Sequence, residues 1–68
     1  MPLNGFEVDI FYYEFEPEAD EHYEFETMEA MFKELPMLQR LKWLVEDDDF
    51  VSVEYQIDTT AVAVRRLP

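Results

Sequence analysis

The side chains that could do chemistry in this sequence are mostly carboxylates. Residues 1–32 contain ten Asp or Glu and no Lys or Arg. Pairs of these acids, such as Glu7 and Asp9, are two residues apart, which on a β-strand places both carboxylates on one face, about 6.6 Å apart. Rows of carboxylates can bind the Lys and Arg side chains of a partner. The acids that we assign to a partner-binding surface are Glu7, Asp9, Glu14, Glu16, Glu18, Asp20, Glu21, Glu24, Glu26, Glu46, Asp47, Asp48 and Asp49.

Residues suited to catalysis or metal binding are sparse. The chain has no cysteine, and His22 and Ser52 are its single histidine and serine. The acidic run at 46–49 lacks the alternating acids, central glycine and terminal glutamate of an EF-hand loop, so we interpret it as a solvated acidic loop or as part of the anionic surface. His22 has acids around it in the sequence, which predicts an exposed imidazole with a raised pKa. We therefore predict no catalytic residue, no metal and no cofactor, and a protein that is not an enzyme.

The charge distribution favours a cationic partner. The formal net charge is −12; residues 33–45 and 59–68 carry +2 each, against −10 for residues 1–32 and −6 for residues 46–58. A structured surface of one sign is expected to bind the basic groove of a nucleic-acid-binding protein and to repel DNA and anionic membranes. Carboxylate rows on a twisted hairpin approximate the spacing of a phosphate row. The alternative is a small interaction module, monomeric or homodimeric, that binds through an aromatic patch or a free sheet edge and is acidic only for solubility.

Size and composition predict one compact domain, residues 1–68. A chain of 68 residues has no room for a second domain. Its hydrophobic share of 49% and aromatic share of 16% are too high for intrinsic disorder, despite the charge. No apolar run approaches the roughly 18 residues that span a membrane, and the first residues do not have the pattern of a secretory signal. We therefore expect a soluble cytoplasmic protein.

Alternation of apolar and polar residues predicts the strands. Residues 5–16 alternate, but their acids change from odd to even positions near Tyr12–Tyr13, which predicts a bulge or bend there. Residues 22–26 indicate a short second strand that pairs back on the first. Residues 50–57 show the clearest strand pattern. Residues 61–67 form a final strand, and the short connection between the last two is typical of an antiparallel hairpin.

The segment between the two strand pairs is predicted to be helical. Thr27 is suited to cap a helix N-terminus, and apolar residues follow it at helical spacing. Pro36 leaves two interpretations: one kinked helix over residues 27–46, or two short helices with Pro36 opening the second. The predicted class is α+β, an antiparallel sheet of three to four strands with the helical segments on one face. The order is β-β-α-β-β, or β-α-α-β-β if residues 21–26 form a loop, and the open face carries many of the acids.

In size, charge and architecture the chain resembles the small acidic proteins that phages encode as DNA mimics, among them anti-CRISPR and anti-restriction proteins. The residues that carry the resemblance are the acids from Glu7 to Glu29 and from Glu46 to Asp49, on a compact α+β body. The resemblance implies a non-catalytic inhibitor in the host cytoplasm. Such an inhibitor would occupy the DNA-binding groove of a host defence complex, for example a CRISPR–Cas effector.

Overall fold

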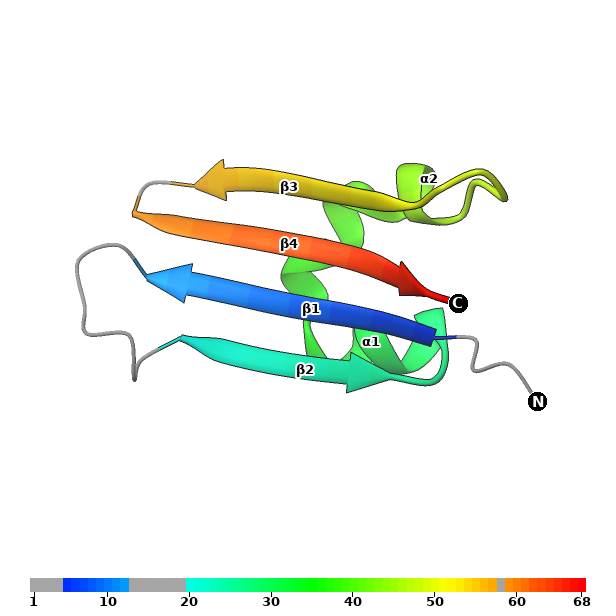
Figure 1. The fold of residues 1–68 in the computed structure, drawn as a ribbon, viewed down its shortest axis with the longest axis horizontal. Helices are drawn as coiled ribbons and strands as arrows, with labels where there is room; N and C mark the ends of the chain where they lie inside the picture. Colours follow the sequence, from blue (N-terminus) through cyan, green and yellow to red (C-terminus); the bar gives the residue numbers. More distant parts are fainter. Residues whose placement is uncertain (1–4, 13–19, 58) are drawn as a thin grey trace.

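A computed structural model describes residues 5–12, 20–57 and 59–68 of the chain. They form a four-stranded antiparallel sheet with helical segments on one face (Figure 1). In chain order the elements are β1 (Gly5–Tyr12), β2 (Glu21–Phe25), α1 (Met28–Glu34), the 3₁₀ helix η2 (Pro36–Leu41), α2 (Lys42–Val45), β3 (Ser52–Ile57) and β4 (Thr60–Leu67). The α+β class and the β-β-α-β-β order are confirmed, with the second strand present. Within the described ranges, no helix is long and apolar enough to cross a membrane.

The strand order is β2-β1-β4-β3, so the first and last strands of the sequence form the centre of the sheet. β1 pairs with β4 without interruption, from Gly5 opposite Leu67 to Tyr12 opposite Thr60. The strand is therefore regular as far as Tyr12. The bulge expected near Tyr12–Tyr13, and the continuation of the strand to residue 16, fall on residues outside the described ranges.

The core lies between the sheet and the helical segments. It consists of buried strand and helix residues: Phe6, Val8, Ile10, Val62, Val64, Met31, Phe32, Leu38, Val45 and Phe50. Full burial of one such side chain contributes about 1.5–3 kcal/mol relative to exposure. Since side chains alternate along a strand, the burial of the even-numbered residues of β1 directs Glu7 and Asp9 to the uncovered side. We call this side the open face, and the prediction that it carries acids is confirmed for these two residues.

The helical layer begins at the predicted cap. The Oγ1 atom of Thr27 accepts a hydrogen bond of 3.1 Å from the backbone N–H of Ala30. α1 ends at Leu35, whose φ of −124° and ψ of 75° are far from helical values, as expected for the residue before a proline. Pro36 then opens η2, and α2 follows it directly. The second of the two interpretations, with Pro36 starting a new helical segment, is the one observed.

Candidate functional site

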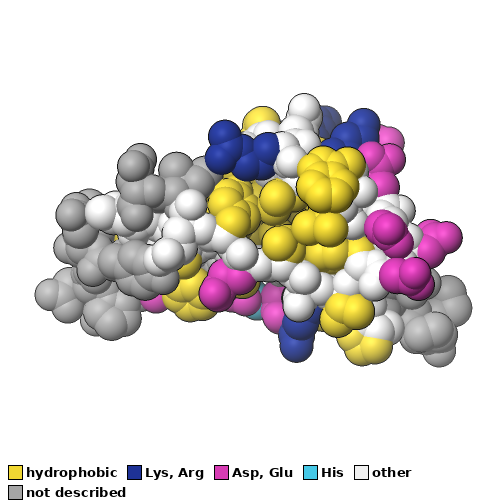
Figure 2. Space-filling model, turned by 90° about the horizontal axis from the view of Figure 1, so that it is seen from above, with side chains coloured by type: hydrophobic (Ala, Val, Ile, Leu, Met, Phe, Trp, Pro, Cys, Tyr) yellow, Lys and Arg dark blue, Asp and Glu magenta, His cyan; other side chains and the backbone are white. Residues whose placement is uncertain are grey.

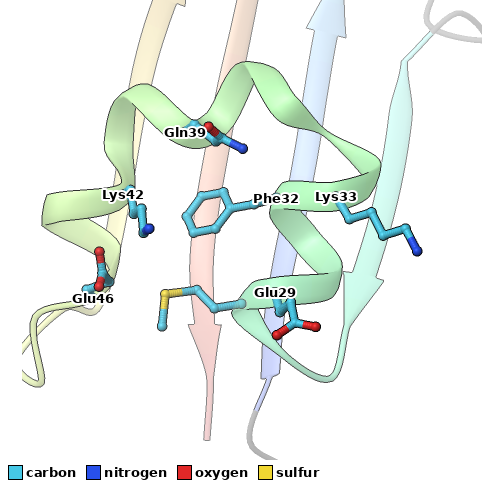
Figure 3. A pocket seen from close by; sticks show the side chains of 7 residues that line it. Glu29, Phe32, Lys33, Gln39, Lys42 and Glu46 are labelled. Carbon is cyan, nitrogen blue, oxygen red and sulfur yellow. The ribbon is translucent and has the colours of Figure 1, made fainter.

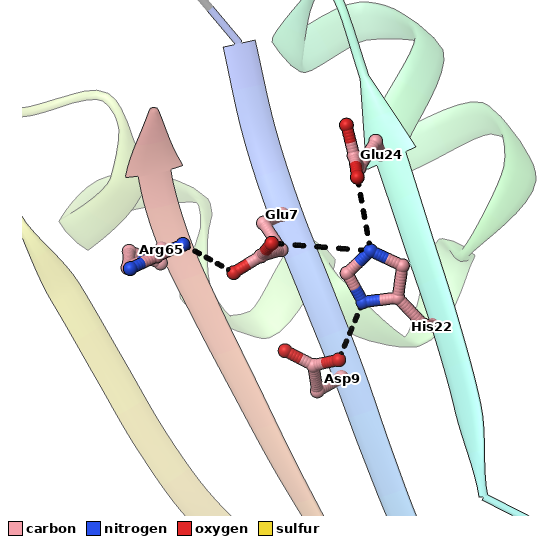
Figure 4. Close-up of polar contacts among 5 residues, drawn as sticks. All are labelled: Glu7, Asp9, His22, Glu24 and Arg65. Atoms are coloured by element: carbon pink, nitrogen blue, oxygen red, sulfur yellow. Dashed lines mark hydrogen bonds and ion pairs between the residues drawn. The ribbon is translucent and has the colours of Figure 1, made fainter. Parts of the chain in front are cut away.

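The open face brings acids from two strands together around one histidine. In the register of β1 and β2, Asp9 lies opposite His22 and Glu7 lies opposite Glu24. The Nδ1 atom of His22 is 2.6 Å from Asp9 Oδ1, and its Nε2 atom is 3.1 Å from Glu24 Oε2 and 3.8 Å from Glu7 Oε2 (Figure 4). We call these residues, with Arg65, the His22 network.

The carboxylates hold His22 in its charged form. Hydrogen bonds from the imidazole to Asp9 and then to Glu24 raise the pKa of His22 to about 9, and the charges of Asp9 and Glu7 add to the effect. The predicted upward shift is confirmed. Its main cause is Asp9, which lies on the neighbouring strand, and not the sequence neighbours Asp20 and Glu21. The signal that could have found Asp9 is the register of the hairpin, which sequence patterns leave open.

The negative charge of Glu7 is also compensated by a cation on β4, the neighbouring strand on its other side. The Nη2 atom of Arg65 on β4 is 2.7 Å from Glu7 Oε1, and the two residues are paired in the register of β1 and β4. Glu7 and Glu24 face each other across β1 and β2, an arrangement of like charges that is destabilising by itself. His22 and Arg65 offset this repulsion. Three acids of the predicted binding surface, Glu7, Asp9 and Glu24, are thus engaged by the chain's own cations.

The same network contains possible metal ligands. Glu7, His22 and Glu24 each offer one ligand atom, and these atoms lie within 4.8 Å of one another. An imidazole with two carboxylates suits a divalent transition metal, and Asp9 would hold the other ring nitrogen. All of these side chains have partners within the network. Their positions are therefore explained without an ion.

A second acidic surface gathers at the end of the molecule where α1 begins, α2 ends and β4 ends. We call it the acidic end, and it consists of Glu26, Glu29, Glu46, Asp47, Asp48 and Asp49, all exposed. Glu29 and Glu46 line one groove on the helical face, of about 490 Å³ (Figure 3). Glu26 lines a smaller pocket together with Arg66. Figure 2 shows carboxylates concentrated at this end of the visible surface.

The carboxylates of the acidic end contrast with those of the His22 network. Within the described ranges, none of them forms an ion pair with Lys, Arg or His. Five of these acids are among the predicted partner-binding residues, whereas Glu29 was named only among the acids that carry the resemblance to DNA mimics. The groove that Glu29 shares with Glu46 is what adds Glu29, and this groove depends on how η2, which contacts both helices, places α1 relative to α2.

Arg66 fixes the backbone of the acidic end. Its guanidinium donates hydrogen bonds to three carbonyl oxygens, those of Val45 (3.2 Å), Asp47 (3.2 Å) and Asp48 (3.0 Å). It also lies 5.8 Å from the ring centroids of Phe6 and Phe50, in cation–π geometry. A cation is favourable where a helix ends, because the last carbonyls carry partial negative charge. Because Arg66 binds carbonyls, the carboxylates of the loop remain exposed.

The remaining predicted site residues have structural contacts or lie outside the described ranges. Asp20 Oδ1 accepts a hydrogen bond of 3.1 Å from the backbone N–H of Tyr12, and Glu21 accepts one of 2.8 Å from the hydroxyl of Tyr23. The first contact joins the residue before β2 to the end of β1, and the second lies within β2. Glu14, Glu16 and Glu18 fall outside the described ranges.

The groove on the helical face offers no catalytic arrangement. Its lining residues are Met28, Glu29, Phe32, Lys33, Gln39, Lys42 and Glu46 (Figure 3). The set contains no serine, cysteine or histidine that a neighbouring base could activate.

Comparison with known proteins gives no relative from which a role could be transferred. No protein-family model matches the sequence, and no curated protein or solved structure is significantly similar to it. Function must therefore be argued from the two acidic surfaces themselves.

Proposed function

We propose that this protein is a non-catalytic inhibitor that mimics the charge of DNA and occupies the nucleic-acid-binding groove of a host defence complex, such as a CRISPR–Cas effector. The acidic end is the contact surface, and Lys and Arg side chains of the partner are its counterions. The observation that carries the proposal is the group of six exposed carboxylates without a cationic partner among the described residues.

The contrast between the two acidic surfaces supports this assignment. On the open face, His22 and Arg65 neutralise part of the charge of Glu7, Asp9 and Glu24. At the acidic end, Arg66 binds backbone carbonyls. Lys33 and Lys42 line the groove with Glu29 and Glu46, but among the described residues they form no ion pair with these acids. Uncompensated charge is therefore concentrated at the acidic end, where a cationic partner gains most from binding.

The position of the acidic loop also favours a binding role. Asp47, Asp48 and Asp49 follow the end of α2, where the helix dipole disfavours each nearby anion by about 0.3–1 kcal/mol. Arg66 offsets this cost at the carbonyls, but the neighbouring carboxylates still repel one another. A partner that supplies cations removes that repulsion. Asp47 also has a structural role, because its Oδ1 atom accepts a hydrogen bond of 2.8 Å from the backbone N–H of Asp49. Functional demand on the loop explains its other acids, whose placement folding alone disfavours.

The test begins with capture of the partner from lysate of the native host at low and at high salt. The affinity of the captured complex is then measured for two variants, one with Asp47, Asp48 and Asp49 changed to Asn, and one with Glu26, Glu29 and Glu46 changed to Gln. We expect each to weaken binding roughly tenfold, from about 0.5 kcal/mol per charge, and to reduce the salt dependence.

The matched control changes two exposed acids that lie outside the acidic end, Glu34 and Glu54, to Gln. This variant should bind within about twofold of the parent chain, since long-range charge alone is screened at physiological salt. If both acidic-end variants keep full affinity, the acids serve solubility and the proposal is wrong. Equal weakening by the control would show that net charge, and not the acidic end, determines binding.

A further inference from the structure

The sheet edge formed by β3 carries an exposed apolar patch. Trp43 is 75% exposed, Val51 70% and Met37 43%. Figure 2 looks onto this edge and shows hydrophobic side chains gathered over β3 and the helical segments behind it. Met37 and Arg40 are three residues apart in η2, and 3₁₀ geometry aligns side chains at this spacing; Trp43 follows in α2. We call Met37, Trp43 and Val51, with the half-buried Val53 and Tyr55 beside them, the β3 edge patch.

The backbone of β3 is also open on this side. The N–H of Arg66 donates to the carbonyl oxygen of Val51 (2.9 Å), so the Val51 carbonyl points toward β4. In an antiparallel ladder the backbone N–H and C=O groups of successive residues point to opposite sides of the strand. The groups of Ser52 and Glu54 therefore point away from the sheet. An edge strand with outward donors and acceptors next to apolar side chains is a template for a further strand.

We propose that a second copy of this chain occupies the β3 edge patch, through antiparallel pairing of two β3 strands about a two-fold axis. Such an interface is self-complementary, as cyclic dimers require. In each copy, the outward N–H and C=O groups of Ser52 form hydrogen bonds with those of Glu54 in the other copy. The two sheets then form one continuous sheet of eight strands, with both helical layers on the same side.

The register follows from which side chains can face each other. Because paired residues must lie on the same face of the sheet, the two-fold axis passes through a residue of β3 and not between two residues. An axis at Glu54 places two Glu54 carboxylates opposite each other, which is destabilising. An axis at Val53 pairs Val53 with its counterpart and Val51 with Tyr55. This register buries apolar side chains of the patch and avoids the like-charge pair.

Local charge favours this edge over the other one. β3 contains one acid, Glu54, while η2 and α2 contribute Arg40 and Lys42. Burial raises the pKa of Tyr55, and the charge of Arg40 partly offsets this rise. With the axis at Val53, Tyr55 and Arg40 of one copy approach Val51 of the other and the acidic loop that precedes it. By contrast, the β2 edge presents exposed Glu21 and Glu24.

The net charge of −12 makes the salt dependence of this dimer distinctive. Two copies repel each other at long range, and salt screens that repulsion beyond about 8 Å at physiological ionic strength. The dimer should therefore tighten as salt rises, whereas binding of the acidic end to a cationic partner should weaken. The paired backbone groups and the apolar contacts of β3 include no acidic-end carboxylate, and the acidic loop lies only at the rim of this interface. The variants that test the dimer leave the acids of the loop unchanged, so this proposal and the proposed function can fail independently.

The test is sedimentation equilibrium of the full chain at 0.05, 0.15 and 0.5 M salt, conditions spanning about 14 to 4 Å of screening length. We expect a monomer–dimer equilibrium whose dissociation constant falls at least tenfold across this range. Emission of Trp43, the single tryptophan, should shift to shorter wavelength with protein concentration as the ring leaves water. A protein that is monomeric at millimolar concentration in 0.5 M salt, or a dimer that weakens with salt, overturns the proposal.

Three variants locate the interface. Val51→Lys and Ser52→Pro should each weaken the dimer at least tenfold; the proline removes an outward N–H and leaves the ladder to β4 intact. Ala30→Lys adds the same charge as Val51→Lys at an exposed position of α1 and should leave the dimer unchanged. Circular dichroism is used to check that each variant is folded. Dimerisation that survives both Val51→Lys and Ser52→Pro in folded protein also overturns the proposal.

Discussion

His22 and Asp9 face each other across β2 and β1, with Nδ1 and Oδ1 2.6 Å apart. This contact joins the edge strand to the centre of the sheet, and a charged imidazole strengthens it. Because its pKa is about 9 in the folded chain and about 6.5 when unfolded, His22 binds its proton more tightly in the folded state. The pH dependence of folding reports this difference directly.

The first prediction concerns pH. The stabilisation from charged His22 is fully present below about pH 6.5 and is lost as pH rises through about 9. Melting temperature should therefore fall across this interval. Circular dichroism melts in matched salt measure the fall, and an NMR titration of the imidazole gives the pKa itself. His22→Gln removes the titrating group and should flatten the curve; an equally steep fall in that variant would assign the effect to other groups.

The second prediction concerns the pairing of Glu7 with Arg65. Arg65→Met removes one of the cations that offset the repulsion between Glu7 and Glu24. Unfolding in urea should show a loss of about 0.2–1 kcal/mol, the range for exposed ion pairs. Glu7→Gln in the same background should restore part of the loss. A double-mutant cycle with no coupling energy would show that the 2.7 Å contact is not a stabilising pair.

The third prediction concerns the hydrogen bonds from Arg66 to the carbonyl oxygens at the end of α2 and in the loop that follows it. Arg66→Met removes three hydrogen bonds to carbonyl oxygens and two cation–π contacts while keeping much of the side-chain volume. We expect the free energy of unfolding to fall by about 2–4 kcal/mol. Arg66→Lys keeps the charge but cannot reach all three acceptors, so it should be intermediate. Equal stability of the lysine variant and the parent chain would assign the effect to charge alone.

The fourth prediction concerns the hydroxyl of Tyr55. Its oxygen is buried and has no hydrogen-bond partner among the described residues, an arrangement that costs free energy. Tyr55→Phe should leave stability unchanged or raise it by about 1 kcal/mol, as measured by urea unfolding. Tyr23→Phe is the matched control, because the Tyr23 hydroxyl donates to Glu21 and its loss should destabilise slightly. Destabilisation by Tyr55→Phe comparable to that control would mean that the hydroxyl has a partner.

Local patterns in the sequence located most of the elements, but they left open whether residues 21–26 form a strand and whether Pro36 kinks one helix or opens a second. Alternation located β1 as far as Tyr12, the hydroxyl of Thr27 located the start of α1, and the restriction that Pro36 places on Leu35 located its end. These features depend on residues a few positions apart. The short strand β2 could be predicted because its alternation is regular, even though it is rich in acids.

The site required long-range information that no local pattern contains. Arg65 and Arg66 are among the last residues of the chain, yet one pairs with Glu7 and the other holds the loop after α2. Only the placement of β4 between β1 and β3 brings them there. For this reason the acid count of residues 1–32 overstated how much charge the open face leaves uncompensated.

The central position of β4 has a consequence for synthesis of the protein. β1 is the first of the four strands to be made, but its neighbour on one side is Thr60–Leu67, which is made more than forty residues later. Until that strand emerges, β1 and β2 form an isolated hairpin, which is marginal in water. The sheet and its core can therefore assemble only after β4 has been translated. Folding of this sheet is governed by its most distant pair of strands.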